Sequence, residues 1–257
     1  ISLTLENMYT ETKLSFLPED ATGDVMYIDD ELQGEKETVK ASKVLDLFRA
    51  NPNQHVKIET WNNMPTAAGL SSSSSGLSAL VKAANELFQV GKTQSELAQI
   101  AKFASGSSSR SFFGPLAAWD KDSGDVYQVE TDLKLAMIML VLTDQKKPVS
   151  SRDGMKLCTE TSTSFPEWIK QSEQDYKDML GYLKANDFQA VGELTEANAL
   201  RMHHTTVATS SSRGLSNGIE SLLCFFEFFQ LVHINIWTQW FQLITDSLKA
   251  ALKQVLI

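Results

Sequence analysis

The chain has few of the residues that mark disulfide-rich, metal-binding or nucleic-acid-binding proteins. Only two of its 257 residues are cysteines, Cys158 and Cys224, and they do not have a metal-ligand spacing. Cationic residues are also few, since 23 Lys and Arg stand against 32 Asp and Glu for a net charge of −9. This charge argues against nucleic acid as a partner, and the scarcity of cysteine indicates a cytoplasmic protein without disulfides.

Long apolar runs and targeting signals are scarce as well. The N-terminal residues do not have the composition of a secretory signal. The most apolar run, residues 219–243, is interrupted by Glu220, Glu227 and His233. We therefore reject a membrane-spanning helix and a membrane partner, and expect a buried helix or helical hairpin in this run.

The stretch from Met64 to Val81 is the most distinctive one that the chain contains. Gly69 is followed by five consecutive serines, 71–75, and then by apolar residues at helical spacing. A loop entering a helix offers free backbone N–H groups and a partial positive charge, which suit a phosphate. It is not a G-x-x-x-x-G-K-[ST] loop. A flexible serine linker is the alternative, but a strand-like run at 55–60 precedes the stretch, so the pattern favours a phosphate-binding loop.

Periodicity predicts mixed strands and helices in the first part of the chain and mostly helices after it. Lys147-Pro148 separates the two parts, so we predict an α+β protein with domains 1–147 and 148–257. A capping box at Thr93–Glu96 predicts a helix start, and Pro166 predicts another. The expected strands cover 1–5, 10–16, 25–28, 55–60, 126–129 and 135–142, and the expected helices cover 39–48, 77–81, 97–104, a segment from 164 to 183 and 188–203.

Two arginines occur in serine- and glycine-rich surroundings that we expect to be loops. Arg110 follows Gly106, and Arg152 lies in the stretch from Ser150 to Met155. The planar guanidinium group suits carboxylate and phosphate. Each arginine alone is more often part of a surface ion pair, but two in such surroundings fit a polyanionic ligand better.

Several motifs together carry a resemblance to a known family. The Pro-x-x-x-Gly-Leu-x-Ser-Ser pattern at Pro65–Ser73 resembles the phosphate loop of the GHMP small-molecule kinases. The Ser-Gly-Ser-x-x-Arg motif ending at Arg110, Ser-Ser-Arg-Asp-Gly-Met ending at Met155, and the run from Glu196 to His203 narrow the match. From Ile1 to about Thr206 the chain resembles the mevalonate diphosphate decarboxylases of the Gram-positive bacterial type.

This resemblance implies a GHMP-kinase-like, two-lobed fold with the active site in the cleft between the lobes. It implies a homodimer, the cofactors ATP and Mg²⁺, and the substrate mevalonate 5-diphosphate. The reaction would be ATP-dependent decarboxylation to isopentenyl diphosphate, a step of the mevalonate pathway of isoprenoid biosynthesis. The implied residues are Gly69, Ser71, Ser72, Ser73 and Ser74 for ATP, with Ser72 and Ser73 nearest Mg²⁺; Ser105, Ser107 and the catalytic candidate Arg110 for the carboxylate end; and Ser151, Arg152 and Met155 for the diphosphate.

Two parts of the family pattern are missing. The family's first strand carries an Asn-x-Ala-x-x-Lys-Tyr-Trp-Gly-Lys segment, and the chain begins at Ile1, after it. The family's catalytic aspartate lies in a Met-Asp-Ala-Gly-Pro-Asn segment, which nothing in 207–257 matches, so its role is not transferred to Asp246. A GHMP-type kinase, such as phosphomevalonate or mevalonate kinase, and a non-catalytic ligand-binding relative therefore stay open. His203 is equally a site residue or a charge partner for a helix C-terminus.

Overall fold

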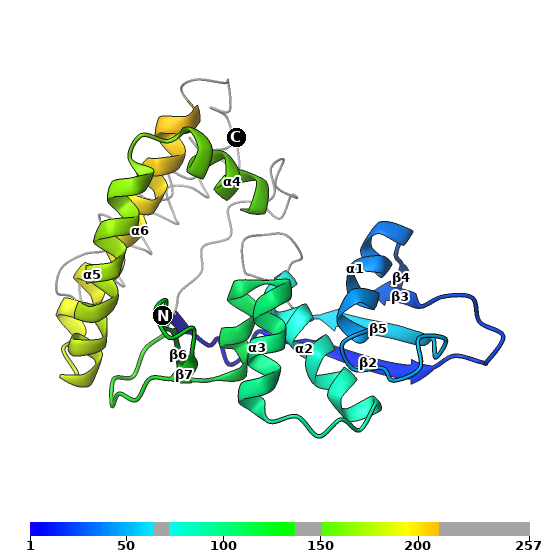
Figure 1. The fold of residues 1–257 in the computed structure, drawn as a ribbon. Helices are drawn as coiled ribbons and strands as arrows, with labels where there is room; N and C mark the ends of the chain where they lie inside the picture. The colour runs from blue at the N-terminus through cyan, green and yellow to red at the C-terminus, as the bar shows by residue number, and fades with distance from the viewer. Residues whose placement is uncertain (64–71, 137–150, 211–257) are drawn as a thin grey trace, which may run out of the picture.

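The computed structural model describes residues 1–63, 72–136 and 151–210, and in these ranges the chain is a mixture of helices and strands (Figure 1). The predicted α+β class is therefore confirmed. In chain order the elements are β1 (Ser2–Leu3), β2 (Thr10–Phe16), β3 (Val25–Ile28), β4 (Glu31–Leu32), α1 (Glu35–Leu45), β5 (Val56–Asn62), α2 (Ser72–Leu87), α3 (Gln94–Ala104), the 3₁₀ helix η1 (Gly106–Phe112), β6 (Leu116–Trp119), β7 (Val126–Gln128), α4 (Ser151–Thr161), α5 (Phe165–Lys184) and α6 (Phe188–Ser210).

A four-stranded sheet with the order β2-β5-β3-β4 forms the first core. β5 is antiparallel to β2 and parallel to β3. Alternate residues of β5 are buried, among them Val56 and Ile58, as expected for a strand with one face on a core. Leu45 from α1 and Val81 from α2 are also fully buried in this cluster, so α2 is fixed against the sheet by its apolar face.

A buried ion pair ties the loop before β3 to the segment that follows α1. Arg49 Nη2 lies 2.6 Å from Asp24 Oδ2, and both side chains are almost fully buried. Burial alone would raise the pKa of Asp24, but hydrogen bonds from Arg49, Ser42 and the Val56 N–H hold this pKa below its usual value. The pair stabilises this end of the sheet while Asp24 stays ionised.

A smaller sheet, ordered β1-β6-β7, packs against α5 and forms a second core. Leu116, Val129 and Leu183 are buried there. At the edge of this core the hydroxyl groups of Tyr127 and Tyr176 are 2.9 Å apart. The β6–β7 hairpin is thus joined to the α5–α6 pair, whose two helices lie side by side in Figure 1.

A polar cluster connects α5 to α6. The carboxylate of Asp175 is buried and accepts hydrogen bonds from Gln171 on its own helix and from Asn198 and Arg201 on α6. These donors hold the pKa of Asp175 below its usual value against the opposing effect of burial. Helix α4 packs in turn on α6, so the polar cluster lies within the framework that supports α4.

The structure corrects some of the expected elements. Both stretches expected to be arginine-bearing loops are helical: residues 106–112 form η1, and α4 begins at Ser151. Serine is a favourable residue at a helix start, which is why a serine-rich stretch does not exclude a helix. The strand expected over 1–5 is only Ser2–Leu3. Residues 135–136 are not in a strand, and most of the remaining expected strand, like the apolar run 219–243, lies outside the described residues.

Candidate functional site

The serine run enters a helix, as predicted. Helix α2 begins at Ser72, and its first turns pass close to β2, where a Cβ on Gly76 would lie 4.0 Å from Thr10 Cγ2. Ser72 and Ser74 are buried, whereas Ser73 is exposed. Of the serines predicted to bind ATP, Ser73 is therefore the one that the described structure presents to solvent at the helix N-terminus. Gly69 and Ser71 lie outside the described residues.

A chain of hydroxyl groups joins this helix to the Ser-Gly-Ser-x-x-Arg motif. Ser74 Oγ lies 2.5 Å from Ser107 Oγ, and Ser107 Oγ lies 3.1 Å from Ser105 Oγ. The three serines come from two motifs that are separated by α3. The structure therefore brings together predicted nucleotide and substrate residues on one hydrogen-bonded path.

Ser78 supports this path, although the sequence analysis did not single it out. Its hydroxyl lies 2.8 Å from the carbonyl oxygens of both Ser74 and Ser108, so it links α2 to η1. Ser108 and Ser109 are fully buried. The available signal was the i, i+4 spacing of Ser74 and Ser78, which puts both residues on one helix face.

Arg110 is partly buried beside β1. Its Nε donates a hydrogen bond to the hydroxyl of Ser2, which is 108 positions away in the sequence. Burial lowers the pKa of Arg110, but arginine stays protonated in proteins because its pKa lies so far above neutral. The guanidinium group is thus a partly desolvated cation, and such a cation attracts an anion more strongly than an exposed one does.

The predicted diphosphate residues lie on α4. Ser151 and Arg152 occupy its first turn, and Met155 is half exposed. The side chains of Ser151 and Arg152 are outside the described part of the structure. Cys158, on the same helix, is buried as a small core residue. His203 lies on α6 and is half-buried.

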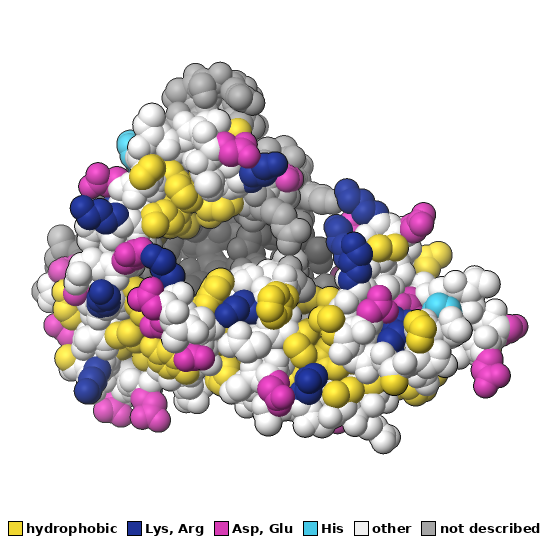
Figure 2. Space-filling model, in the orientation of Figure 1, with side chains coloured by type: hydrophobic (Ala, Val, Ile, Leu, Met, Phe, Trp, Pro, Cys, Tyr) yellow, Lys and Arg dark blue, Asp and Glu magenta, His cyan; other side chains and the backbone are white. Residues whose placement is uncertain are grey.

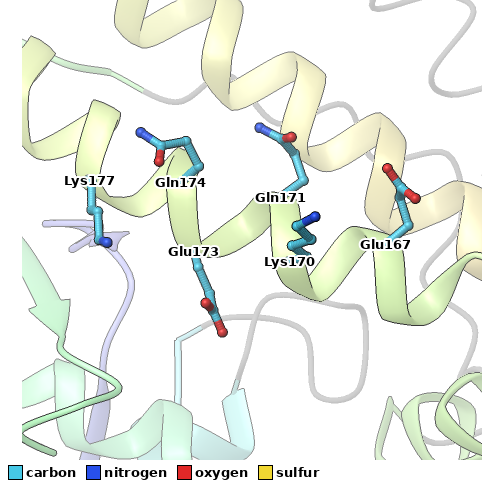
Figure 3. A pocket seen from close by; sticks show the side chains of 6 residues that line it. All are labelled: Glu167, Lys170, Gln171, Glu173, Gln174 and Lys177. Carbon is cyan, nitrogen blue, oxygen red and sulfur yellow. The ribbon is translucent and has the colours of Figure 1, made fainter.

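A shallow cavity of about 280 Å³ lies elsewhere, along α5. Figure 3 shows that its side chains come from this one helix and include both charge signs, among them Lys170 and Glu173. None of the predicted site residues lines it. A surface of mixed charge is a poor match for a polyanion, so we do not place the functional site there.

Oxygen ligands are available for a magnesium ion that arrives with a nucleotide. Hydroxyl and phosphate oxygens are the ligands that hard cations such as Mg²⁺ prefer. The exposed Ser73 fits this requirement, while Ser72 is largely buried. Within the described ranges we find no group of three His, Cys, Asp or Glu side chains that could hold a metal.

The length and polarity of the described helices can be compared with those that a membrane-spanning helix needs. In the described ranges, each helix is too short or too polar to cross a bilayer. Figure 2 shows Lys and Arg side chains interspersed with Asp and Glu on the face in view.

Comparison with known proteins identifies the fold type and the family of this chain. The fold is that of the GHMP-kinase type, with α+β structure around the serine-bearing helix. A model described as "Diphosphomevalonate decarboxylase-like N-terminal domain" matches residues 1–129, half of the chain. A second, "Mevalonate 5-diphosphate decarboxylase C-terminal domain", matches residues 137–213. The chain belongs to the diphosphomevalonate decarboxylase-like family.

Individual relatives agree with this membership. The structure of mevalonate pyrophosphate decarboxylase from Streptococcus pyogenes is 64% identical, with a TM-score of 0.77, over 81% of this chain and 66% of that chain. The structure titled "MDDEF in complex with MVAPP, AMPPCP and Magnesium" is 36% identical with a TM-score of 0.70, over 81% of this chain and 66% of that one. Diphosphomevalonate decarboxylase from Candida albicans is 35% identical over 57% of this chain and 43% of its own length.

These matches confirm the predicted resemblance to the decarboxylases of Gram-positive bacteria. They also show that the chain spans about two thirds of the streptococcal protein's length and less than half of the Candida protein's. Within this family, binding of an ATP analogue and of magnesium is seen directly in a solved structure.

Proposed function

We propose that this chain catalyses the ATP-dependent decarboxylation of mevalonate 5-diphosphate to isopentenyl diphosphate, with release of ADP, phosphate and CO₂. The observation that carries the proposal is the hydroxyl path from Ser74 through Ser107 to Ser105. It puts the start of the predicted nucleotide helix next to the predicted substrate motif. Phosphoryl transfer depends chiefly on such positioning and on neutralisation of charge.

On the nucleotide side, ATP would lie at the N-terminus of α2. Gly69, Ser71, Ser72, Ser73 and Ser74 form the proposed phosphate-binding segment, and the exposed Ser73 is best placed for a magnesium-bound phosphate. The solved structure of a relative in complex with MVAPP, AMPPCP and magnesium supports this choice of cofactors. The magnesium ion would neutralise phosphate charge when bound.

On the substrate side, the proposed roles divide between two cationic residues. Arg110, with Ser105 and Ser107, would hold the carboxylate and the neighbouring tertiary hydroxyl in line with ATP. Arg152, with Ser151 and Met155, would bind the diphosphate at the other end. The two ends need different contacts because only the first of them reacts.

The proposed chemistry has two stages. The tertiary hydroxyl gives up its proton to solvent as its oxygen attacks the γ-phosphorus of ATP, and ADP leaves. The new phosphate group then departs with its bonding electrons, so positive charge develops at the tertiary carbon. The bond to the carboxylate breaks, its electron pair forms the new double bond, and CO₂ is released. No described residue is assigned the role of the family's catalytic aspartate.

The lobes at 1–147 and 148–257, the homodimer and the cytoplasmic location are part of the same proposal. The boundary near Lys147-Pro148 falls in a segment outside the described residues. The complexes of relatives with MVAPP support mevalonate diphosphate as the small-molecule partner.

The test is to incubate the purified chain with ATP, Mg²⁺ and mevalonate 5-diphosphate and to measure ADP and CO₂. Equal amounts of both products are expected. ADP without CO₂ would instead identify a GHMP-type kinase, and substrate binding without either product would identify a non-catalytic relative.

The proposed role of the serine run in ATP binding is tested separately with Ser73→Ala. Loss of a hydrogen bond to a charged phosphate should raise the KM for ATP roughly tenfold or more. The melting temperature should stay the same because Ser73 is exposed. Ser72→Ala should also weaken ATP binding, but with some loss of stability because Ser72 is buried. Unaltered ATP kinetics in the Ser72→Ala/Ser73→Ala double variant would show that the serine run does not bind the nucleotide.

A further inference from the structure

Ser74 differs from its neighbours in the serine run by what its side chain contacts. It is 6% exposed, and its hydroxyl lies 2.5 Å from that of Ser107. Ser73, the preceding residue, is exposed. Two adjacent serines of α2 therefore face different surroundings, one solvent and the other the Ser-Gly-Ser motif.

The hydroxyl groups of Ser74, Ser107 and Ser105 carry three protons in all, and this number restricts how the three groups can bind an anion. A serine hydroxyl has one proton to donate and two lone pairs to accept. Three hydroxyls joined by two hydrogen bonds use two of their three protons between themselves. One proton is left to donate outward, and the direction of the Ser74–Ser107 bond decides at which end it leaves.

An anionic substrate selects one of the two directions, because carboxylate and phosphate groups only accept hydrogen bonds. If Ser74 donates to Ser107, the spare proton leaves from Ser107 or Ser105, at the substrate end. If Ser107 donates to Ser74 instead, Ser107 cannot also donate to the substrate. Ser74 would then have to direct its own proton elsewhere from a buried position.

The surrounding contacts hold the segments that carry Ser74 and Ser107 next to each other. Ser78 links the backbone of Ser74 to that of Ser108, so α2 and η1 cannot separate without breaking a second bond. On the other side Trp119 packs directly on Gly106, where an added Cβ would lie 2.7 Å from the ring. The Ser107 hydroxyl therefore lies on a backbone that is constrained from two directions.

We infer that Ser74 is a positioning residue for the substrate rather than a nucleotide ligand: its hydroxyl donates to Ser107 and thereby directs a serine proton towards the substrate's carboxylate end. The inference rests on the proposed function. Ser74 is thereby moved from the ATP-binding residues to the residues that orient the substrate-binding serines. Ser73 remains a nucleotide contact.

The experiment compares Ser74→Ala with the same substitution at Ser75, the next residue of the helix. Binding of mevalonate 5-diphosphate and of AMPPCP with Mg²⁺ is measured for each variant by calorimetry, together with the melting temperature. Ser74→Ala should raise the Kd for mevalonate diphosphate about three- to tenfold, the loss expected for one hydrogen bond. Its Kd for AMPPCP should stay within about twofold of the wild type, and Ser75→Ala should change neither constant.

A double-mutant cycle makes the test specific to the Ser74–Ser107 bond. Ser107→Ala should weaken substrate binding at least as much as Ser74→Ala does. In the double variant, loss of Ser74 should add less than about a twofold effect. Ser74→Thr, which keeps the hydroxyl, should bind substrate like the wild type.

Each result bears on the inference. Unchanged substrate binding in Ser74→Ala, weakening confined to AMPPCP, or additive effects in the double variant would overturn it. Should Ser74→Ala fail to fold, weak substrate binding by a folded Ser74→Thr would overturn it and wild-type binding would support it. If the wild-type chain binds no mevalonate diphosphate, the proposed function fails too, whereas normal wild-type binding with an unaffected Ser74→Ala refutes only this inference.

Discussion

Replacing Gly106 with alanine should disturb both stability and the proposed substrate site. Gly106 lies between Ser105 and Ser107, and the ring of Trp119 occupies the space that a side chain at this position would need. An added Cβ would lie 2.7 Å from Trp119 Cζ3 and 3.0 Å from Cη2. These distances are well inside van der Waals contact, so either the ring or the backbone must move.

The expected magnitude follows from this geometry. Ordinary carbon–carbon contacts are about 3.5–4.0 Å long, so the ring must retreat by roughly 1 Å. The ring is also in a cation–π contact with Lys102, whose ammonium lies 5.4 Å from the ring centre and donates to the Gly124 carbonyl. Overpacking of this kind costs about 1–3 kcal/mol. Since Trp119 is 37% exposed, we expect about 1–2 kcal/mol, which lowers the melting temperature by roughly 2–8 °C in a chain of this size.

The value of kcat/KM should fall further than the loss of folding stability alone would explain. If part of the strain is relieved by the backbone, the Ser105 and Ser107 hydroxyls shift, and a misplacement of about 1 Å can cost up to 10²-fold in rate. Thermal denaturation and kcat/KM for mevalonate diphosphate measure the two effects. Gly181→Ala and Gly192→Ala are matched controls, because a Cβ at either helical position meets nothing within 4 Å. Each control should gain about 0.5–1 kcal/mol from the helix preference of alanine.

The role of the tryptophan ring is tested by a second substitution. In a Trp119→Leu background the ring is gone, so Gly106→Ala should cost little stability. A melting temperature and kcat/KM equal to the wild type in Gly106→Ala alone would refute the argument. So would an equal loss with and without the ring.

Two further predictions concern charged residues. The pKa of Asp24 is held low in the folded chain. The ion pair with Arg49 therefore adds its full contribution to the free energy of unfolding above about pH 4, the usual pKa of an aspartate. This contribution is lost as the pH falls through the lower folded-state pKa. Asp24→Asn should cost about 3 kcal/mol at pH 7 in denaturant unfolding, and this difference should shrink at pH 3; a constant difference would contradict the assignment. Arg152→Ala should mainly raise the KM for mevalonate diphosphate, whereas Arg110→Ala should mainly lower kcat, each by about one to two decades. Unchanged constants in both folded variants would make the two arginines structural.

Much of the fold could be predicted because it depends on local patterns. Strands 10–16 and 25–28 have the bounds that their sequence predicts. The capping box at Thr93 forms as expected, since its two hydrogen bonds join residues only three positions apart. Family membership could likewise be predicted, because short motifs of fixed spacing carry it.

The same local reasoning failed where packing decided the outcome. The stretch around Arg152 has the composition of a loop, yet it forms the first turn of α4. A helix of this kind is stabilised mainly by the face it buries, here including Cys158, and the composition of its first turn does not reveal that face. Composition alone could not predict this.

The sequence by itself thus determined which residues are candidates for binding, and the tertiary structure decided which of them lie within hydrogen-bonding distance of one another. Nothing in the local pattern relates Ser74 to Ser107, 33 positions on, or Arg110 to Ser2. Those contacts exist because α2, η1 and β1 pack against neighbouring elements and bring distant side chains within hydrogen-bonding distance. The physical reason is that a hydroxyl group makes a hydrogen bond only at about 3 Å, and only the packed fold sets distances on that scale between residues far apart in the chain.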